Sequence, residues 1–448
     1  MQTPLEMVPG KIIRDLGDGY VLRWSTRADA DAVGELSAIV FHIPDSDQPN
    51  PRVHRWAADL CGRPHPTMVE GCVTVVEDTR AKRLVSSMCL VPQTWCCEDL
   101  AFPVSRPEIV VTREDCRRRG FVRAQFEAFH AWSKGRGDRM QAITGIPWYY
   151  RQFGYELALD LGGGRRTPVG LIPAPDAKAE RPYRTRRAMA KDLPALRAIY
   201  EHNTRNLLYT LQYEDAVWRY DIDGRSPDTG VASNVVETAD GEVIGWFVHP
   251  FWKWAGRMHC YTFWLLPGHS YRAVAPYVAE ALRHFGEHDA QGNDEPVKTL
   301  FWELGERHPL YDAYPREMAD TVPPFAWYIR VPDIPGFVDF LRPVLDRRLE
   351  QSPFAGHTGT LTINGFTWGM RLTIDRGRVN AVAPHLIDVS KEAADADFPN
   401  LTFLMALMGR RTLDEIKPIY PDCNAKDEAY GLISALFPKR PSRVIGVA

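Results

Sequence analysis

The sequence predicts two α/β units in tandem, followed by a smaller α+β domain. The first observation is the order of strand and helix patterns, β-α-β-β-β-α-β-α-β, before the glycine run Gly162–Gly164. The second is that a similar order begins again after Pro173–Pro182, a linker rich in proline, alanine and charge. The third is the change at Asp333, after which alternating strands and short helices follow one another. We therefore expect domains at residues 1–165, 180–332 and 333–448.

In the first unit, β-branched runs and alternation predict the strands, and apolar residues at helical spacing predict the helices. Val33, Leu36 and Val40, for example, share one face of a helix from about Asp29 to Phe41. The predicted strands are Tyr20–Trp24, Val73–Val76, Leu84–Val91, Ala101–Pro103, Glu108–Thr112, Met140–Thr144 and Leu157–Leu161. The other helical segments are expected within His42–Leu60, from Phe121 to Gly135–Gly137, and within Gly145–Glu156.

The same patterns recur in the second unit and change in the third. For the second unit we expect strands at Tyr183–Arg187, Val235–Thr238, Val243–His249, Met258–Leu266, Thr299–Leu304 and Trp327–Val331, with helices at Asp192–Tyr200 and Tyr271–Phe285. In the third, Asn364-Gly365 is a strong two-residue hairpin signal between two strands. We expect its strands at Thr358–Ile363, Phe366–Ile374 and Val379–Val382, and helices around Phe337–Leu345, Thr402–Met408, Thr412–Lys417 and Lys426–Leu436.

Composition argues against several classes of protein. The 54 basic and 57 acidic residues give a net charge of −3, whereas binding a phosphate backbone needs a basic excess or a basic face. No apolar run reaches the length of a spanning helix, and the N-terminus lacks a signal-peptide core, so we expect a cytoplasmic protein. No cysteine, histidine or acidic spacing matches a metal site, and His42, His54 and His65 are expected to be solvated or capping.

The stretch Thr112–Phe129 carries the strongest functional signal. The β-branched run Ile109–Val111 predicts a buried strand, and the apolar stripe that begins at Phe121 predicts an amphipathic helix. Between them, Arg117–Gly120 forms a basic turn beside a helix start, where unpaired N–H groups and a partial positive charge favour anions. Our hypothesis is that this turn holds the pyrophosphate of coenzyme A. The alternative is a solvated basic turn before an ordinary core helix.

The second unit differs at the corresponding place. Pro267–Arg272 stands where the first unit has its arginines and glycine, so we expect no cofactor there and interpret this unit as a scaffold or a wall of the substrate pocket. Its aromatic stretch, which includes Trp246, Phe247, Phe251, Trp252 and Trp254, is interpreted either as the lining for a bulky acceptor or as packing between domains.

Two motifs carry a resemblance to a known family. Arg117-Arg118-Arg119-Gly120-Phe121-Val122 resembles the Arg/Gln-x-x-Gly-x-Gly/Ala cofactor signature of the GCN5-related N-acetyltransferases (GNAT superfamily), with Val122 in place of a small residue. Tyr150-Arg151-Gln152-Phe153-Gly154-Tyr155 resembles the family's second signature. The three-part layout resembles the Eis-like (enhanced intracellular survival) type. That resemblance implies tandem GNAT folds, each a mixed, mostly antiparallel sheet with flanking helices, followed by a sterol-carrier-protein-like domain.

The resemblance also implies a reaction and a set of site residues. The expected activity is acyl transfer from acetyl-CoA, or another acyl-CoA, to an amine of a small molecule or peptide. Tyr150 is the expected general acid, with Tyr149 and Tyr155 as packing residues, and the base is either the terminal carboxylate of Ala448 or Glu108. The expected cofactor-binding residues are Ile109, Val110, Val111, Arg117, Arg118, Arg119, Gly120, Phe121, Val122 and Arg123.

One alternative function remains open at this point. In this alternative, the chain is a non-catalytic CoA- or lipid-binding protein. Its last domain carries an apolar ligand, and its two GNAT-like units are a degenerate scaffold. The resemblance to the Eis-like group also implies a homo-oligomer. The identity of the amine lies beyond the sequence, because loops that line a pocket set this specificity.

Overall fold

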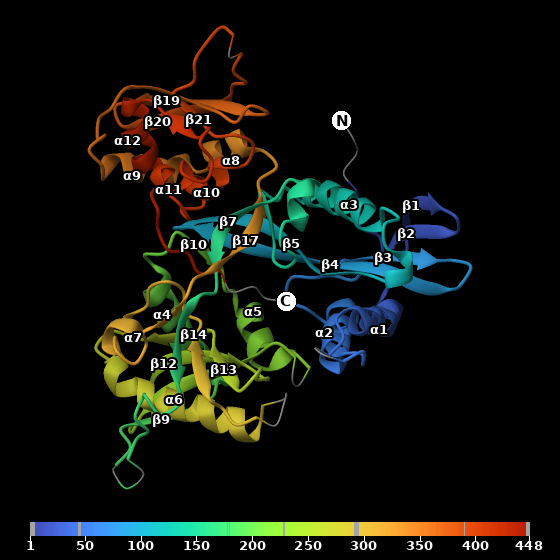
Figure 1. Cartoon of the computed structure of the whole chain (residues 1–448), viewed down its shortest axis with the longest axis vertical. Coiled ribbons are helices and arrows are strands. Elements are labelled where there is room, and N and C mark those ends of the chain that lie inside the picture. The colour runs from blue at the N-terminus through green and yellow to red at the C-terminus, as the bar shows by residue number, and fades with distance from the viewer. Residues whose placement is uncertain are drawn as a thin grey trace.

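A computed structural model describes residues 5–43, 46–176, 178, 180–226, 229–290, 295–388 and 390–444. Figure 1 shows three bodies: a central sheet with its helices, a second α/β body below it, and a smaller body above. The mixed α/β architecture agrees with the fold class expected from the sequence. Among the described residues, no helix combines the length and apolar character needed to cross a bilayer.

The central sheet belongs mainly to the first unit. Its strand order is β1-β2-β3-β4-β5-β6-β17-β7, with β10 paired to β4. The strands are β1 (Ile12–Gly17), β2 (Tyr20–Trp24), β3 (Val73–Asp78), β4 (Arg83–Cys97), β5 (Leu100–Thr112), β6 (Met140–Ile143), β7 (Glu156–Leu161), β10 (Tyr209–Leu211) and β17 (Phe325–Arg330). Helix α3 (Phe121–Arg136) covers one face, and α1 (Ala30–Val40) and α2 (Pro51–Gly62) cover the other (Figure 1).

One boundary in the first unit differs from the sequence prediction. Ala101–Pro103 and Glu108–Thr112 were expected as separate strands, but they are the two ends of the continuous strand β5. The polar residues between them are buried with partners: Ser105 donates to an Asp138 carboxylate oxygen, and Arg106 donates to Glu108. The strand therefore passes through a segment whose composition indicates a turn, although Nε and one terminal nitrogen of Arg106 are buried without a hydrogen-bond partner in the described structure.

Two strands are exchanged between the first and second units. Strand β17 lies in the second half of the sequence but pairs with β6 and β7 of the central sheet. Conversely, β8 (Gly164–Pro168), which follows β7, pairs with two strands of the second unit. The domain ranges expected from the sequence remain a prediction. This exchange interlocks the two units and fixes how the second unit faces the first.

The second unit contains two four-stranded sheets with the orders β14-β12-β11-β9 and β13-β15-β8-β16. The strand expected over Met258–Leu266 is divided at Tyr261, so that its first part pairs in parallel with β15 and its second part pairs with β12. The elements are β9 (Tyr183–Arg187), α4 (Leu193–Thr204), α5 (Asp215–Arg219), β11 (Val231–Thr238), β12 (Val243–Pro250), β13 (Arg257–Cys260), β14 (Thr262–Leu265), α6 (Tyr271–His288), β15 (Thr299–Trp302), α7 (Pro309–Ala313) and β16 (Asp320–Val322).

The last domain has a five-stranded sheet with the order β20-β19-β18-β21-β22. Its strands are β18 (Gly359–Asn364), β19 (Gly369–Asp375), β20 (Arg378–Pro384), β21 (Ala396–Asp397) and β22 (Asn424–Ala425); its helices are α8 (Ile334–Phe340), α9 (Arg342–Glu350), α10 (Phe403–Leu407), α11 (Leu413–Ile416) and α12 (Asp427–Leu436). The Asn364-Gly365 signal does not form a two-residue turn, because the hairpin closes with the pair Asn364–Gly369. The Asn364 carboxamide oxygen instead accepts from Phe366 N at 3.0 Å and supports a longer loop.

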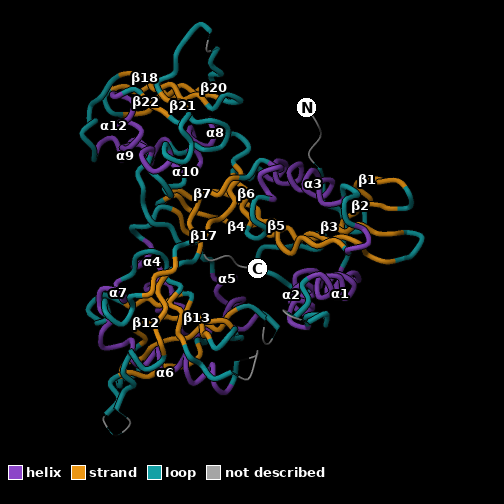
Figure 2. The backbone as a smooth tube through the Cα atoms, in the orientation of Figure 1, coloured by secondary structure: helices purple, strands orange, loops and turns teal. Residues whose placement is uncertain are grey.

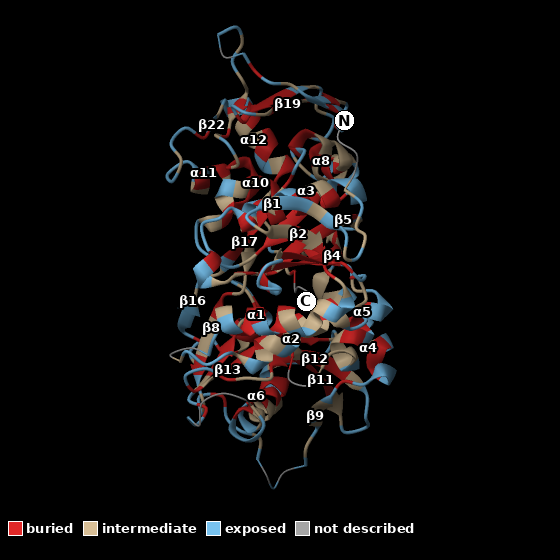
Figure 3. Ribbon diagram, turned by 90° about the vertical axis from the view of Figure 1, so that its right-hand side faces the viewer, coloured by how far each residue is buried: buried red, intermediate tan, exposed pale blue. Residues whose placement is uncertain are grey.

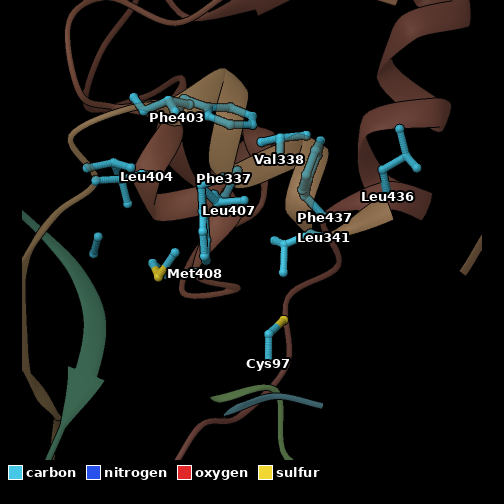
Figure 4. Close-up of a cluster of buried hydrophobic side chains, with 14 of the residues drawn as sticks. Cys97, Phe337, Val338, Leu341, Phe403, Leu404, Leu407, Met408, Leu436 and Phe437 are labelled. Carbon is cyan, nitrogen blue, oxygen red and sulfur yellow. The ribbon is translucent and has the colours of Figure 1, made fainter. Parts of the chain in front are cut away.

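The core of the last domain reaches the central sheet. Figure 4 shows Phe337, Val338 and Leu341 packed among Phe403, Leu404, Leu407, Met408, Leu436 and Phe437, with Cys97 of β4 on the side of the first unit. All of these residues are buried in one cluster. Figure 3 shows the same pattern through the molecule, with buried residues concentrated along the sheets and the helix faces that cover them.

The segment after α12 returns to the other two units. Leu208 N donates to Pro441 O at 2.8 Å, and Arg443 N donates to Tyr209 O at 2.9 Å. Thr210 and Arg443 also form a parallel bridge. Because β10 pairs with the end of β4, this segment lies where the three bodies meet (Figure 2).

Candidate active site

The basic turn leads into α3 as the sequence predicts. Gly120 is the N-cap of α3, with φ of +79° and no side-chain cap, so the side chains of the turn leave the first N–H groups of the helix uncovered. A Cβ at Gly120 would meet no atom within 4 Å, so the left-handed backbone, rather than lack of space, favours glycine. The side chains of Arg117, Arg118, Arg119 and Arg123 are exposed around this helix start. This arrangement fits a phosphate group.

A buried hydrogen-bond network fixes α3 against the sheet. Gln125 of α3 accepts from Ser86 Oγ at 2.8 Å and donates to the carbonyl and hydroxyl oxygens of Thr74, each at 3.2 Å. Ser86 lies on β4 and Thr74 on β3, so one glutamine ties the helix to two strands. The first turn of α3 is therefore held in a defined place relative to the end of β5.

The strands beside this turn separate. β5 and β6 pair only at Val104–Met140 and Ser105–Gln141, and β5 then continues with β4 alone. Beyond that point a bulge leaves two residues of β5, Ile109 and Val110, opposite one residue of β4. Ile109 has φ of +47°, a left-handed conformation that is unfavourable for a β-branched residue. Such bulges redirect backbone groups, and this one includes Ile109 and Val110, which the family resemblance implies as cofactor-binding residues.

Tyr150 lies in a 3₁₀ helix, Tyr149–Phe153, between β6 and β7. Its ring is buried and its centre lies 5.4 Å from that of Tyr328 and 5.9 Å from that of Phe126. Burial raises the pKa of the Tyr150 hydroxyl, and the charge of Glu108 raises it further. In the described part of the chain, no group forms a hydrogen bond to this hydroxyl. Tyr150 is therefore a protonated phenol at neutral pH, without a competing partner.

Tyr328, a residue that the sequence reading did not select, anchors the loop before Tyr150. Its hydroxyl accepts a hydrogen bond from Trp148 N at 2.6 Å, and Trp148 has a left-handed φ of +67°. Tyr328 belongs to the exchanged strand β17. No local sequence pattern reveals this role, because it depends on a strand that arrives from the second half of the chain.

Glu108 forms an ion pair with Arg106 two residues earlier on β5. Arg106 is 4% exposed, its guanidinium carbon lies 4.6 Å from the centre of the Trp327 ring, and burial lowers its pKa. The cation of a buried arginine is costly without a partner, so this pair holds the Glu108 carboxylate on the wall of the separated strands. The sequence reading selected Glu108 but not Arg106.

The other candidate residues lie as follows. Tyr155 is buried against His130, with 3.1 Å between its hydroxyl and His130 Nε2, and Tyr149 packs on Tyr150 and Phe153. Val122 packs against the core of the first unit. Ala448 lies outside the described residues.

The three histidines that were expected to be solvated or capping make local contacts. His54 Nε2 is 3.2 Å from an Asp31 carboxylate oxygen, His65 Nδ1 accepts from Thr67 N and Met68 N, and His42 contacts the Ile43 carbonyl. Within the described ranges, no cluster of three or more His, Cys, Asp or Glu residues has the arrangement of a metal site.

A comparison with protein families matches the part of the chain that contains this candidate site. Residues 22–158 match the model of the acetyltransferase (GNAT) domain. The match spans β2 to β7 and includes the basic turn, the separated strands and Tyr150. It covers less than half of the chain, so it describes the first unit rather than the whole protein. No curated protein matches the sequence.

Solved structures with the same fold cover almost the whole chain. A probable N-acyltransferase from Enterococcus faecalis V583, titled as a conserved protein of unknown function, has 13% identity and a TM-score of 0.63 over 95% of this chain and 97% of its own. A GCN5-related N-acetyltransferase from Kribbella flavida has 15% identity and a TM-score of 0.62 over 95% and 99%. Eis1 from Mycobacterium abscessus has 14% identity and a TM-score of 0.57 over 94% and 98%.

At these identities the solved structures show the fold alone. The GNAT domain match supports an acyltransferase, and a GNAT fold implies an acyl-CoA co-substrate. The residues of the basic turn fit such a molecule, because they present exposed cations around an uncapped helix start.

Proposed function

We propose that the chain is an acetyl-CoA-dependent N-acetyltransferase that acts on an amine of a small molecule or peptide. One observation carries the proposal. The uncapped first turn of α3, with its exposed arginines, follows β5 along the chain, and the bulge of β5 lies next to Glu108, whose charge acts on the Tyr150 hydroxyl. A phosphate site and an acyl-transfer site are thereby supported by one continuous segment of the GNAT domain.

The proposed reaction is a direct transfer. The amine nitrogen attacks the thioester carbonyl carbon, a C–N bond forms, and the C–S bond breaks. Backbone N–H groups at Ile109–Val111 would stabilise the charge on the carbonyl oxygen. Tyr150 would donate its proton to the departing thiolate, since burial keeps the phenol protonated at neutral pH. The proton lost by the amine passes to a base, which restores the proton balance.

Two groups are proposed as that base. Glu108 lies on the strand beside the bulge, and its Oε1 accepts from Arg106, which fixes the carboxylate in place. The terminal carboxylate of Ala448 is the second candidate, and it has support in the return of residues 441–443 to the junction of the units. Deleting residues 445–448 separates the two: full activity after the deletion would exclude the terminal carboxylate, and Glu108→Gln then tests the other.

We also propose that the chain is of the Eis-like type, with a sterol-carrier-like last domain and a homo-oligomeric assembly. The support is the coverage of both chains in the comparison with Eis1 and the three-part layout. Sedimentation analysis of the purified chain tests the assembly, and a monomer at micromolar concentration would contradict it.

The decisive experiment combines cofactor binding with thiol release. Acetyl-CoA is expected to raise the melting temperature, and a panel of amines with acetyl-CoA and longer acyl-CoAs should identify acceptors by release of free CoA. The variant Arg119→Ala, and more so Arg119→Ala with Gly120→Val, should lose the thermal shift. Arg283→Ala is the matched control, because Arg283 is an exposed arginine of α6 in the second unit. No shift with any CoA ester at millimolar concentration would refute the proposal.

A further inference from the structure

A chain of charged and aromatic contacts joins the first turn of α2 to the divided strand of the second unit. The guanidinium carbon of Arg52 lies 4.8 Å from the centre of the Trp252 ring, which lies 5.8 Å from the centre of the His259 ring. His259 Nδ1 is 3.0 Å from Glu303 Oε2, and the Glu303 carbonyl accepts from Arg443 at 2.9 Å. We call these five residues the junction cluster. It brings together the first unit, the second unit and the C-terminal segment.

The charges of the junction cluster do not balance. Arg443 donates to the carbonyl oxygens of Tyr261 and Glu303 rather than to a carboxylate. Arg52 is partly buried, which lowers its pKa, and no carboxylate of the described ranges pairs with it. The Glu303 carboxylate contacts His259. Two guanidinium groups and one carboxylate therefore leave one positive charge uncompensated.

The position of Arg52 in α2 increases this local positive charge. Arg52 follows Pro51 at the start of the helix, and no acidic residue lies in the first turn. The Asn50 carboxamide oxygen accepts from Arg52 N at 3.2 Å and from Val53 N at 3.3 Å, so the chain caps these backbone donors itself. A cation near a helix N-terminus is electrostatically unfavourable. The group that could still bind an anion is the Arg52 guanidinium, which lies over the Trp252 ring.

His259 provides an independent indication of a ligand. The residue is 9% exposed, and its Nε2 atom is buried without a hydrogen-bond partner in the described structure. Its ring centre lies 5.9 Å from that of Tyr261 and 5.0 Å from that of Phe301, so aromatic rings surround it. A buried polar atom without a partner costs about 1–3 kcal/mol. A ligand that brings an N–H or O–H group would remove this cost.

We propose that the junction cluster binds a carboxylate at Arg52, while His259 Nε2 accepts a hydrogen bond from the same molecule. A guanidinium over an aromatic ring can still use N–H groups at its edge for two parallel N–H···O bonds, which match a carboxylate. One uncompensated positive charge matches one carboxylate. This inference rests on the proposed function, since it makes the acceptor an amine that also bears a carboxylate, such as an amino acid or a peptide. The chain's own C-terminal carboxylate is the other source of the same chemistry.

Equilibrium binding tests the proposal without turnover. Titration calorimetry of the full-length protein with CoA present would use N-acetylphenylalanine and its C-terminal amide, which differ only in the carboxylate. We expect the acid to bind more tightly, and Arg52→Met to weaken it about 10–100-fold, the worth of a charge-assisted hydrogen bond, with the amide unaffected. Arg55→Met is the control, because Arg55 is exposed on the same helix. His259→Phe should weaken both probes, since each carries an amide N–H.

The outcomes separate the sources and the two proposals. An acid preference that Arg52→Met removes identifies a carboxylate on the acceptor. If the acid binds more tightly than the amide only after deletion of residues 445–448, and Arg52→Met then removes the difference, the carboxylate at Arg52 is the chain's own C-terminus. The site is overturned if neither the full-length chain nor the chain without residues 445–448 binds the acid more tightly than the amide. It is also overturned if the acid still binds more tightly than the amide in Arg52→Met. Binding of the acid that depends on Arg52, together with no CoA release from any amine, would reject acyl transfer and retain the carboxylate site.

Discussion

The first and second units begin their corresponding helices in opposite ways. In the first unit, α3 starts at Gly120 without a side-chain cap, and exposed arginines surround its first turn. In the second unit, α6 starts at Ser270, whose side chain accepts from Ala273 N. The first N–H groups of α3 are thus left without a side-chain partner, whereas the Ser270 side chain accepts a hydrogen bond from an N–H group of α6. The two units, which have related layouts, therefore differ in how the first N–H groups of these helices are satisfied.

The tyrosines that follow the equivalent strands differ in the same sense. The Tyr150 hydroxyl has no hydrogen bond within the described structure. Tyr311 of α7 donates to the Trp302 carbonyl at 3.0 Å or to the Gly305 carbonyl at 3.1 Å. The Tyr150 proton therefore has no acceptor among the described residues, whereas the Tyr311 proton forms a hydrogen bond that stabilises the fold.

The largest expected effect follows from this pair of tyrosines. Tyr150→Phe should lower kcat about 10²–10⁴-fold with little change in acetyl-CoA affinity, because it removes only the proton donor. Tyr311→Phe should leave kcat unchanged and lower the free energy of unfolding by about 1 kcal/mol, the net worth of a hydrogen bond. Steady-state thiol release and urea unfolding measure the two quantities. Equal losses of kcat in both variants would contradict the expectation that only the Tyr150 hydroxyl acts in catalysis.

A second prediction concerns the two helix starts. Gly120→Ser places a Cβ on a left-handed backbone and offers a competing hydroxyl to the first turn of α3, so acetyl-CoA affinity should fall about 10–100-fold, as for the loss of a charge-assisted hydrogen bond. Ser270→Ala removes the cap of α6 and should cost about 1 kcal/mol of stability. Its acetyl-CoA affinity should equal that of the unaltered chain. Direct titration of the cofactor decides between these expectations, and a weakened cofactor in Ser270→Ala would assign the second unit a part in binding.

The elements that local patterns specify were predictable from the sequence, and those that distant segments specify were not. The turn before α3 was predictable because glycine, arginine and apolar spacing all act within a few residues. The sequence of the exchanged strand β17 predicts a strand, but no pattern in it predicts that β6 and β7 are its partners. Tyr328 was missed for this reason, since its role depends on a contact between β17 and the loop before Tyr150. Arg106 was missed because it packs against Trp327 of the same distant strand, although its ion-pair partner Glu108 is local. The division of the strand at Tyr261 was missed because no glycine or proline interrupts Met258–Leu266.

Buried histidines are a feature that the two units share, and they predict how stability depends on pH. Burial lowers the pKa of His308 in the second unit to about 3, and likewise that of His130 in the first. An unfolded histidine has a pKa of about 6.5. Below that value the unfolded chain takes up protons that the folded chain does not, so stability falls as the pH falls. Each such histidine should cost about 1.4 kcal/mol between pH 7.5 and pH 5.5.

The variant His308→Asn isolates this effect. His308 caps α7 by accepting from Leu310 N at 3.2 Å, and asparagine can accept the same hydrogen bond but does not titrate. The loss of unfolding free energy between pH 7.5 and pH 5.5 should therefore be smaller by about 1.4 kcal/mol in the variant. Urea unfolding at the two pH values measures it, with His130→Gln as the counterpart in the first unit. An equal loss in the variant and the unaltered chain would show that His308 is protonated in the folded state.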